Sequence, residues 1–459
     1  MYDSFDKKHV KELVEARDEA ELIVQLKNVL PSDLAEVLPE LSKKDQRFLF
    51  ELLPQNLATN TFEFLDVSDQ QTLLKQLSIP QVSTLLNALS PDDRTAFLEK
   101  LPPKTIQEYL HLLSPTERLV ALKLLGYPEN SVGRLMTPDF LAVRKDWTVR
   151  QVLDFIRAYG HDSETINLIY VVDDKGKLVD DIKIKEFLFV SPTHKVSDLM
   201  DNSFIALFTT DDQEVAINTF KKNNRGALPV IDAQGVLKGI VTIDDVLFLA
   251  EEEDTEDIQK IGGTEALDEP YMDAPLFHLI RKRGVWLIIL FLGELLTASA
   301  MAYFEQDIAR VVALALFVPL IISSGGNSGS QASTLIIRAM ALGEIRLRDW
   351  WRVMGREIIT GLFLGTILAT IGFIRIGIWS MFSDIYGPHW FLIALAVSTS
   401  LIGVVTWGTI SGSMLPLIIK KCGGDPAISS APFIATLVDV SGIVIYFSIA
   451  VLFLKGVLL

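Results

Sequence analysis

The sequence is poor in the residues that bind soft metals or cross-link a chain. It has 459 residues and one cysteine, Cys422, which excludes an internal disulfide and a thiolate metal site. Its six histidines are scattered, and no two of them form an H-x-x-x-H pair. These absences argue against a zinc or iron enzyme. No set of catalytic residues is visible, so we predict that the chain is not an enzyme.

Basic charge is also scarce, and its distribution divides the chain. Lys and Arg number 42 against 58 Asp and Glu, a net charge of −16. Residues 1–280 carry 49 acidic and 29 basic residues (net −20), and residues 281–459 carry 9 and 13 (net +4), which together give −16. Nucleic-acid binding needs clustered Lys and Arg, so we expect no nucleic-acid partner. The acidic part suits a cationic ligand better.

Residues 1–130 are expected to form a helical domain. LPSDLAEVLPEL (30–41), LPQNLATNTFEFL (53–65) and LSPDDRTAFLEKL (89–101) each begin with Leu, then Pro or Ser, then a polar helix start. Leucines follow at helical spacing, which predicts short helices stacked in a superhelix. The N-terminus is charged and has no apolar run. A signal peptide is therefore not predicted, and residues 1–280 are expected in the cytoplasm.

Residues 132–250 contain a second internal repeat. MTPDFLAVRKDWTVRQVLDFI (136–156) pairs with MDNSFIALFTTDDQEVAINTF (200–220), and IYVVDDKGKLVDDIKIKEFL (169–188) pairs with LPVIDAQGVLKGIVTIDDVL (228–247). Each copy predicts the order strand, helix, strand, turn, strand, helix. The repeat resembles a tandem pair of CBS domains, which implies an α/β fold.

Residues 251–280 are assigned to an acidic connecting segment. The stretch VLFLAEEEDTEDIQKI (246–261) predicts a helix that ends at Gly262 and Gly263. A run of carboxylates is usually only a solvated helix face. Because TTDDQE (209–214) and TIDD (242–245) are also acidic, a cation sensor is the better interpretation.

Residues 281–459 predict a transmembrane domain of five helices, because each apolar run reaches the length that crosses a bilayer. Basic residues flank alternate ends of these runs, which places the N-terminus inside and the C-terminus outside. The predicted spans lie near 285–303, 311–337, 353–380, 390–419 and 427–453.

Two spans contain polar residues that a simple lipid anchor would not need. Asp439 lies about halfway along the fifth span, where an ionised carboxylate costs roughly 2.5–3.5 kcal/mol or more. It either lines a pore or pairs with a buried arginine, for which Arg375 is the candidate. The second span, PLIISSGGNSGSQASTLIIRAM (319–340), is rich in Gly, Ser and amides. It forms either a helix-packing face or a pore wall.

The order of these features resembles the MgtE-type magnesium transporters. The resemblance rests on the helical N-domain, the CBS pair, the acidic helix, GGNSGSQASTLIIRA in the second span and P-x-x-A-T-x-x-D in the fifth. It implies a homodimer in a bacterial inner membrane, with a pore lined by the second and fifth spans of both subunits. The implied function is Mg²⁺-selective, channel-like transport gated by intracellular Mg²⁺.

The resemblance also implies ion ligands. Asp439 matches the pore carboxylate, Ala435 would offer a backbone carbonyl, and Asp425 would lie at the cytoplasmic side of the pore. The sequence departs from the family pattern at Ala431, where an Asn is common, and at Asn224, where an acidic ligand is expected. The sensor ligands implied by the match are Asp212, Glu214, Asp245, Glu253, Glu256 and Asp257, with an N-domain contribution from Asp92 or Asp93.

CBS domains often bind adenine nucleotides, and the second copy keeps Gly239, Thr242 and Asp245 of the nucleotide motif. These residues could hold the ribose of ATP, or they could form a purely structural turn. Two other functions stay open: a broader carrier of Co²⁺, Mn²⁺ or Zn²⁺, and a membrane-anchored nucleotide sensor that conducts no ions.

Overall fold

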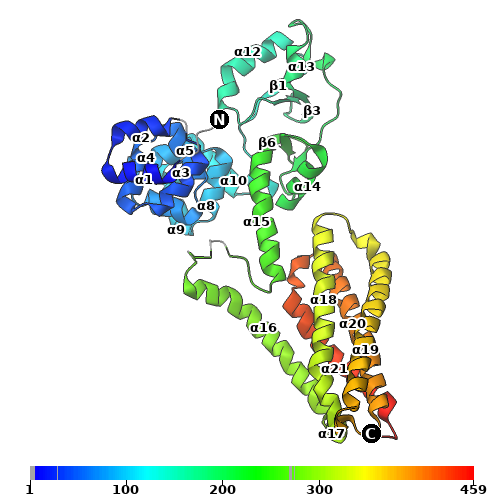
Figure 1. Ribbon diagram of the computed structural model, residues 1–459. Coiled ribbons are helices and arrows are strands. Elements are labelled where there is room, and N and C mark those ends of the chain that lie inside the picture. The colour runs from blue at the N-terminus through cyan, green and yellow to red at the C-terminus, as the bar shows by residue number, and fades with distance from the viewer. Residues whose placement is uncertain (1–5, 28, 268–270, 273, 459) are drawn as a thin grey trace. The chain divides into compact units, whose positions relative to one another are not determined.

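The computed structural model describes residues 6–27, 29–267, 271–272 and 274–458. It contains two compact units, Met1–Glu253 and Asp254–Leu459. The first unit combines the predicted helical N-domain with the predicted α/β repeat, and the second contains the predicted spans (Figure 1).

Short helices stack through the N-terminal part of the first unit. Pro stands in the first turn of several of them, and Ser90 and Ser114 accept hydrogen bonds from the backbone N–H groups of Asp93 and Glu117, as expected of N-caps. Leucines and Phe62 form one continuous core between the helices. The helices are α1 (Lys7–Ala16), α2 (Glu19–Leu26), α3 (Pro31–Val37), α4 (Lys43–Leu52), α5 (Gln55–Glu63), α6 (Val67–Leu74), α7 (Ile79–Ala88), α8 (Pro91–Glu99), α9 (Pro103–Leu112), α10 (Pro115–Leu125) and α11 (Val132–Leu135).

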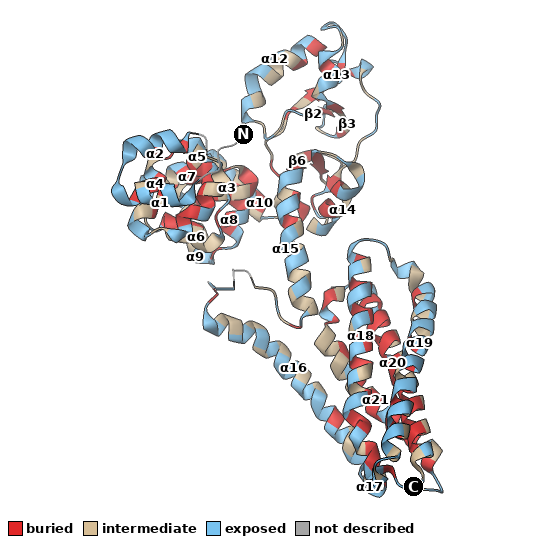
Figure 2. Ribbon diagram, in the orientation of Figure 1, coloured by how far each residue is buried: buried red, intermediate tan, exposed pale blue. Residues whose placement is uncertain are grey.

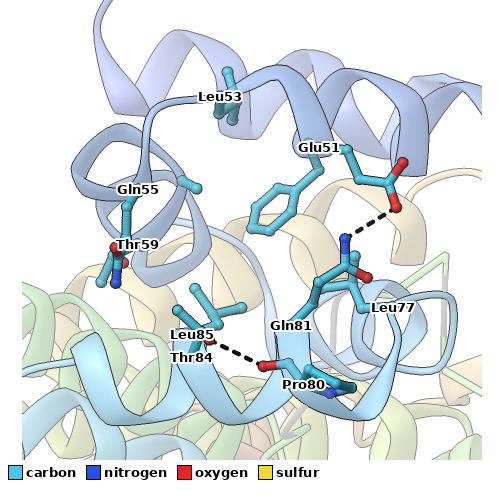
Figure 3. A pocket seen from close by; sticks show the side chains of 11 residues that line it. Glu51, Leu53, Gln55, Thr59, Leu77, Pro80, Gln81, Thr84 and Leu85 are labelled. Atoms are coloured by element: carbon cyan, nitrogen blue, oxygen red, sulfur yellow. Dashed lines mark hydrogen bonds between the residues drawn. The ribbon is translucent and has the colours of Figure 1, made fainter.

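A cavity of about 300 Å³ lies among α4, α5 and α7 (Figure 3). Phe50 and Leu85 contribute to its apolar wall. On its rim, Glu51 accepts a hydrogen bond of 3.0 Å from the amide of Gln81, and this bond lowers the pKa of Glu51. The charged group on the rim is therefore already paired within the protein.

The repeat forms two similar three-stranded sheets, as the sequence predicts. In each sheet the first two strands are parallel and the last two antiparallel. Thr137 pairs with Ile240 through two backbone hydrogen bonds of 2.8 Å, which join the two copies. The first copy contains β1 (Ala142–Arg144), α12 (Val149–Tyr159), β2 (Leu168–Val172), β3 (Leu178–Lys183) and α13 (Ile184–Leu188); the second contains β4 (Leu207–Phe208), α14 (Gln213–Asn223), β5 (Ala227–Ile231), β6 (Leu237–Thr242) and α15 (Ile243–Ile261).

Among the described residues of the second unit, five helices are long and apolar enough to cross a membrane. The first begins at Leu276, earlier than the predicted residue 285, so it contains the basic residues 281–283. The five helices are α16 (Leu276–Tyr303), α18 (Val318–Ala341), α19 (Trp350–Ser380), α20 (Trp390–Lys421) and α21 (Ala431–Leu454), and the short helix α17 (Glu305–Arg310) follows α16.

Helices α18, α19, α20 and α21 form the bundle of the second unit, and most of its buried residues lie between them (Figure 2). The first spanning helix, α16, runs apart from this bundle over its N-terminal half (Figure 1). Only 6% of the most apolar 18-residue stretch of α16 is buried. Lipid or another protein surface must therefore cover most of this helix.

Candidate ion pathway and carboxylate cluster

Asp439 lies inside α21, where the sequence predicts it. Helix α21 begins after Ser430, whose hydroxyl accepts a hydrogen bond from the backbone N–H of Phe433. Gly326 of α18 faces both Asp439 and Ala435: a Cβ at Gly326 would lie 3.7 Å from Asp439 Oδ1 and 3.5 Å from the Ala435 Cα. The two predicted ligands and the small residue of α18 are thus brought together.

Arg375 does not serve as the buried partner considered for Asp439. Its guanidinium carbon lies 4.1 Å from the centroid of the Trp379 ring, on the same helix α19. This cation–π contact gives Arg375 a local partner. The alternative of an Asp439–Arg375 ion pair is therefore not supported.

The small residues of α18 serve as a packing face on one side. Gly325 and Gly329 lie against Gly408 and Gly412 of α20. A Cβ at Gly412 would lie 2.0 Å from the Gly329 carbonyl oxygen, and a Cβ at Gly408 would lie 2.4 Å from the Gly325 carbonyl oxygen. The two helices meet backbone to backbone, as small residues allow in membranes.

The other side of α18 carries polar residues that a single subunit leaves exposed. They are spaced four, four and three residues apart, which places them on one line along the helix. We call this line the polar stripe; it consists of Ser323, Asn327, Gln331 and Thr334. The structure thus confirms the packing face of the second span, and the polar stripe on another face keeps the pore wall as a prediction.

Asp425 is engaged by protein groups in the turn before α21. Its Oδ1 accepts a hydrogen bond of 2.8 Å from the backbone N–H of Ala427. Its Oδ2 accepts one of 2.8 Å from the ammonium of Lys260, which also pairs with Glu256. The predicted ligands Asp425 and Glu256 therefore share a lysine in this structure.

Glu294 is an ionisable residue of a spanning helix that the sequence analysis did not single out. It is exposed on α16 beside Gly293, whose added Cβ would lie 2.8 Å from the Thr436 side chain of α21. The signal was available, because any carboxylate inside an apolar run is a candidate functional residue.

In the first unit, Asp92 is the most deeply buried predicted ligand. Only 7% of Asp92 is exposed, and its Oδ1 has no hydrogen-bond partner. Burial and repulsion by Asp245 raise the pKa of Asp92 well above its usual value. Burial likewise raises the pKa of Asp245 to about 7, although a hydrogen bond from Thr242 opposes the shift. An unpaired buried carboxylate is costly unless a proton or a cation neutralises it.

Several further carboxylates surround Asp92 and Asp245. Burial, with repulsion by Asp93, raises the pKa of Glu63 to about 8, and burial also raises the pKa of Glu164. The sequence analysis did not identify Glu63 and Glu164. Glu63 belongs to helix α5 and Glu164 to the first α/β copy, so both lie far from Asp92 and Asp245 along the chain. We call this group the carboxylate cluster; its members are Glu63, Asp92, Asp93, Glu164, Asp244 and Asp245.

The other predicted sensor residues lie in two further places. Asp212 caps α14 and accepts a hydrogen bond from the backbone N–H of Glu214, while Glu253 accepts one of 2.6 Å from Gln213. Glu256 and Asp257 belong to the second unit. Asn224 ends α14 with φ 45°, a left-handed conformation that Asn tolerates well. Across the described residues, no three His, Cys, Asp or Glu side chains are arranged to hold a metal ion as they stand.

The predicted nucleotide residues have structural partners. A Cβ at Gly239 would lie 2.6 Å from the Thr137 carbonyl oxygen, so the contact between the two copies requires glycine there. Thr242 donates a hydrogen bond of 2.5 Å to Asp245. Elsewhere in the α/β pair, Tyr170 is fully buried and its hydroxyl has no hydrogen-bond partner.

Comparisons with known proteins cover all these regions. Family models match at residues 318–449 (MgtE, divalent cation transporter), residues 30–130 (MgtE intracellular N domain), and residues 132–192 and 196–252 (CBS domain). The chain is 40% identical over 334 residues to magnesium transporter MgtE of Thermus thermophilus, covering 73% of this chain and 72% of that one. It is 29% identical over 447 residues to magnesium transporter MgtE of Bacillus subtilis, covering 95% and 97%.

A solved structure is also similar to about half of the chain. The crystal structure of the cytosolic domain of the Mg²⁺ channel MgtE in complex with ATP aligns with a TM-score of 0.51 and 33% identity. The alignment covers 53% of this chain and 100% of that one. With five helices able to span a membrane among its described residues, and family matches along most of its length, the chain is a multi-pass membrane protein and belongs to the MgtE family of magnesium transporters.

Proposed function

We propose that the protein conducts Mg²⁺ through a pore formed by α18 and α21 of two subunits. The observation that carries this proposal is the carboxylate of Asp439, which lies beside Gly326 inside a spanning helix. Mg²⁺ prefers oxygen ligands and gives up its water reluctantly. Two copies of Asp439 on a two-fold axis would hold the hydrated ion through its waters, with the Ala435 carbonyl one turn away.

The polar stripe supports the homodimer. Ser323, Asn327 and Gln331 would face lipid in an isolated subunit, where unsatisfied polar groups are unfavourable. A second subunit placed against α18 would instead enclose them around a water-filled path. The same arrangement would give the largely exposed α16 a protein surface to contact.

The ligand chemistry favours Mg²⁺ over softer metals. Asp439 and the polar stripe offer side-chain oxygen atoms, which suit Mg²⁺, whereas Zn²⁺ is more often bound by imidazole or thiolate. A broader divalent carrier remains the second candidate function, because the matching family model is described as a divalent cation transporter. Uptake of Mn²⁺ or Co²⁺ at the Mg²⁺ rate would favour it.

We further propose that the carboxylate cluster senses intracellular Mg²⁺. When both are ionised, two carboxylates 4 Å apart repel by about 4 kcal/mol at an effective dielectric constant near 20. The raised pKa values of Asp92 and Asp245 mean that this repulsion grows as pH rises. Without Mg²⁺, this repulsion would favour separation of the elements that carry Asp92 and Asp245. With Mg²⁺ bound, the same side chains would be attracted to one ion, and the elements that carry them would be drawn together. ATP binding to the CBS pair is supported by the ATP-bound relative and is proposed as a modulator.

Basic residues give the proposed orientation. Arg281, Lys282 and Arg283 begin the first span, and Lys420 and Lys421 end the fourth. This bias supports an N-terminus in the cytoplasm and a C-terminus outside, in a bacterial inner membrane.

Flux measurements on Asp439→Ala test the pore. We expect purified Asp439→Ala to assemble normally but to lose most Mg²⁺ uptake into vesicles. The matched control is Asp384→Ala, which removes an exposed carboxylate from the turn after α19. Wild-type uptake by Asp439→Ala would refute the pore assignment. No uptake by the wild-type protein would favour the nucleotide sensor without ion flux.

A further inference from the structure

Lys260 joins the end of helix α15 to the turn that begins α21. Its ammonium donates a hydrogen bond of 2.8 Å to Asp425 Oδ2, and 28% of its side chain is exposed. One helical turn earlier, Glu256 pairs with the same ammonium. Lys260 is therefore a cation of the protein itself, placed between two carboxylates that would otherwise repel each other.

Further contacts hold the same end of α15 within the second unit. Asp254 accepts a hydrogen bond of 3.0 Å from Arg338, in the last turn of α18. After α15 ends, Gly263 adopts φ +77°, and a Cβ there would lie 2.9 Å from Trp286. The Trp286 indole in turn donates a hydrogen bond of 3.3 Å to Ser430, the N-cap of α21.

These contacts suit a reversible attachment rather than a permanent one. The Asp254 and Arg338 side chains are 55% and 57% exposed, so this ion pair contributes little on its own. The Lys260 pair is the less exposed of the two, because the side chains of Lys260 and Asp425 are 28% and 35% exposed. Loss of this single cation would leave Glu256 and Asp425 facing each other without compensation.

We propose that Lys260 acts as a built-in counter-ion, which attaches the end of α15 to the Asp425 turn when no Mg²⁺ is bound. Its consequence for gating rests on the proposed function, in which intracellular Mg²⁺ controls conduction. Without the ammonium, the two carboxylates repel, and α15 detaches in the absence of metal. The freed carboxylates can then bind Mg²⁺, so attachment becomes Mg²⁺-dependent. In the wild-type protein, attachment of this end is independent of Mg²⁺.

Spin-label distances test the attachment without using transport. One label goes on the exposed native Cys422, and the other on an exposed site of α15 made by Thr255→Cys. Doubly labelled subunits are diluted with unlabelled protein, so that distances within one subunit dominate. With chelator, we expect one narrow distance distribution for the wild type and a broad, longer one for Lys260→Gln. Added Mg²⁺ should narrow the Lys260→Gln distribution again.

Two control variants sharpen this result. Lys420→Gln removes an exposed charge in the last turn of α20 and should leave the distribution narrow. Lys260→Arg keeps the cation and should behave as the wild type. A narrow, unchanged distribution for Lys260→Gln in chelator would overturn the proposal, as would broadening that Mg²⁺ does not reverse. In flux assays, Lys260→Gln should need several-fold more Mg²⁺ to close. If no variant conducts, the transport function fails while the distance result still stands.

Discussion

At the residue scale, glycine decides how closely the spanning helices approach. Gly408 and Gly412 of α20 lie four residues apart and face the carbonyl oxygens of Gly325 and Gly329. Any side chain there would separate α18 from α20. Since α18 also carries Gly326, which faces Asp439, the spacing of these helices sets the space around the proposed pore carboxylate.

Gly412→Ala should therefore destabilise the protein, by roughly 1–3 kcal/mol, as expected for an overpacked contact. The matched control is Gly355→Ala in α19, where nothing lies within 4 Å of the added Cβ. That substitution should be neutral or stabilise by up to about 1 kcal/mol, because alanine favours helix. Thermal unfolding in detergent measures both variants. An unchanged midpoint for Gly412→Ala would mean that the helices separate at no cost.

Single residues differ in how far the sequence could predict them. Asp439 was predictable, because a carboxylate inside an apolar run is unusual whatever surrounds it. Gly239 matched a nucleotide motif, yet its contact with Thr137 gives it a packing role. Asn224, an apparent departure from the family, serves as the left-handed end of α14. These two roles depend on neighbours that the local sequence does not reveal.

At the element scale, local patterns predicted the helices and strands well, and long-range contacts explain what was missed. The acidic helix that ends before Gly262 and Gly263 is confirmed, although α15 starts at Ile243, earlier than residue 246. The carboxylate cluster depends on α5, α8, the first α/β copy and α15 lying together. Glu63 and Glu164 have no distinctive neighbours in sequence, so no local pattern could place them beside Asp92.

The cluster predicts how the stability of the first unit depends on pH. Asp245 and Glu63 have pKa values of about 7 and about 8 in the folded protein, against roughly 4 when unfolded. The folded state thus binds more protons than the unfolded state between these values. The contribution of these two carboxyl groups to stability is therefore fully present below about pH 4 and is lost as pH rises through 7 and 8.

With chelator present, the thermal midpoint of the first unit should therefore fall from pH 6 to pH 8, as measured by scanning calorimetry of the full chain. Mg²⁺ should raise this midpoint more at pH 8, where the carboxylates are ionised and free to bind it. In Asp92→Asn, one buried charge is gone, and the fall should be smaller. A midpoint that rises with pH, or a Mg²⁺ effect equal at both pH values, would contradict the cluster as a cation site.

At the scale of the whole molecule, the proposed function assigns ion permeation and sensing to different parts of the chain. The described residues before Asp254 contain no helix that could span a membrane, while the second unit contains five. The sequence indicates a similar division, because residues 1–280 are acidic, whereas residues 281–459 are slightly basic and contain the long apolar runs. The sequence alone does not reveal which of the proposed ion ligands lie in the first unit and which lie in the second. The structure places Asp92 and Asp245 in the first unit, and Glu256, Asp257 and Asp425 in the second.

Removal of residues 1–130 tests this division. The truncated protein should still conduct Mg²⁺, because every residue of the proposed pore remains. Inhibition by internal Mg²⁺ should weaken several-fold, because Glu63, Asp92 and Asp93 leave the carboxylate cluster and Asp245 loses these neighbours. Vesicle uptake, titrated with Mg²⁺ on the cytoplasmic side, measures both properties.

The truncation also removes Leu124, which packs with Val132 and Phe220 in the core of the second α/β copy. Loss of that packing could weaken inhibition without involving any carboxylate. The full-length variant Asp92→Asn separates the two causes, since it keeps the core and changes one buried charge. We expect Asp92→Asn to require more Mg²⁺ for closure, in the same direction as the truncation. If the truncation is folded and inserted but conducts nothing, the N-terminal helices are needed for permeation itself, and the division between sensing and permeation is wrong.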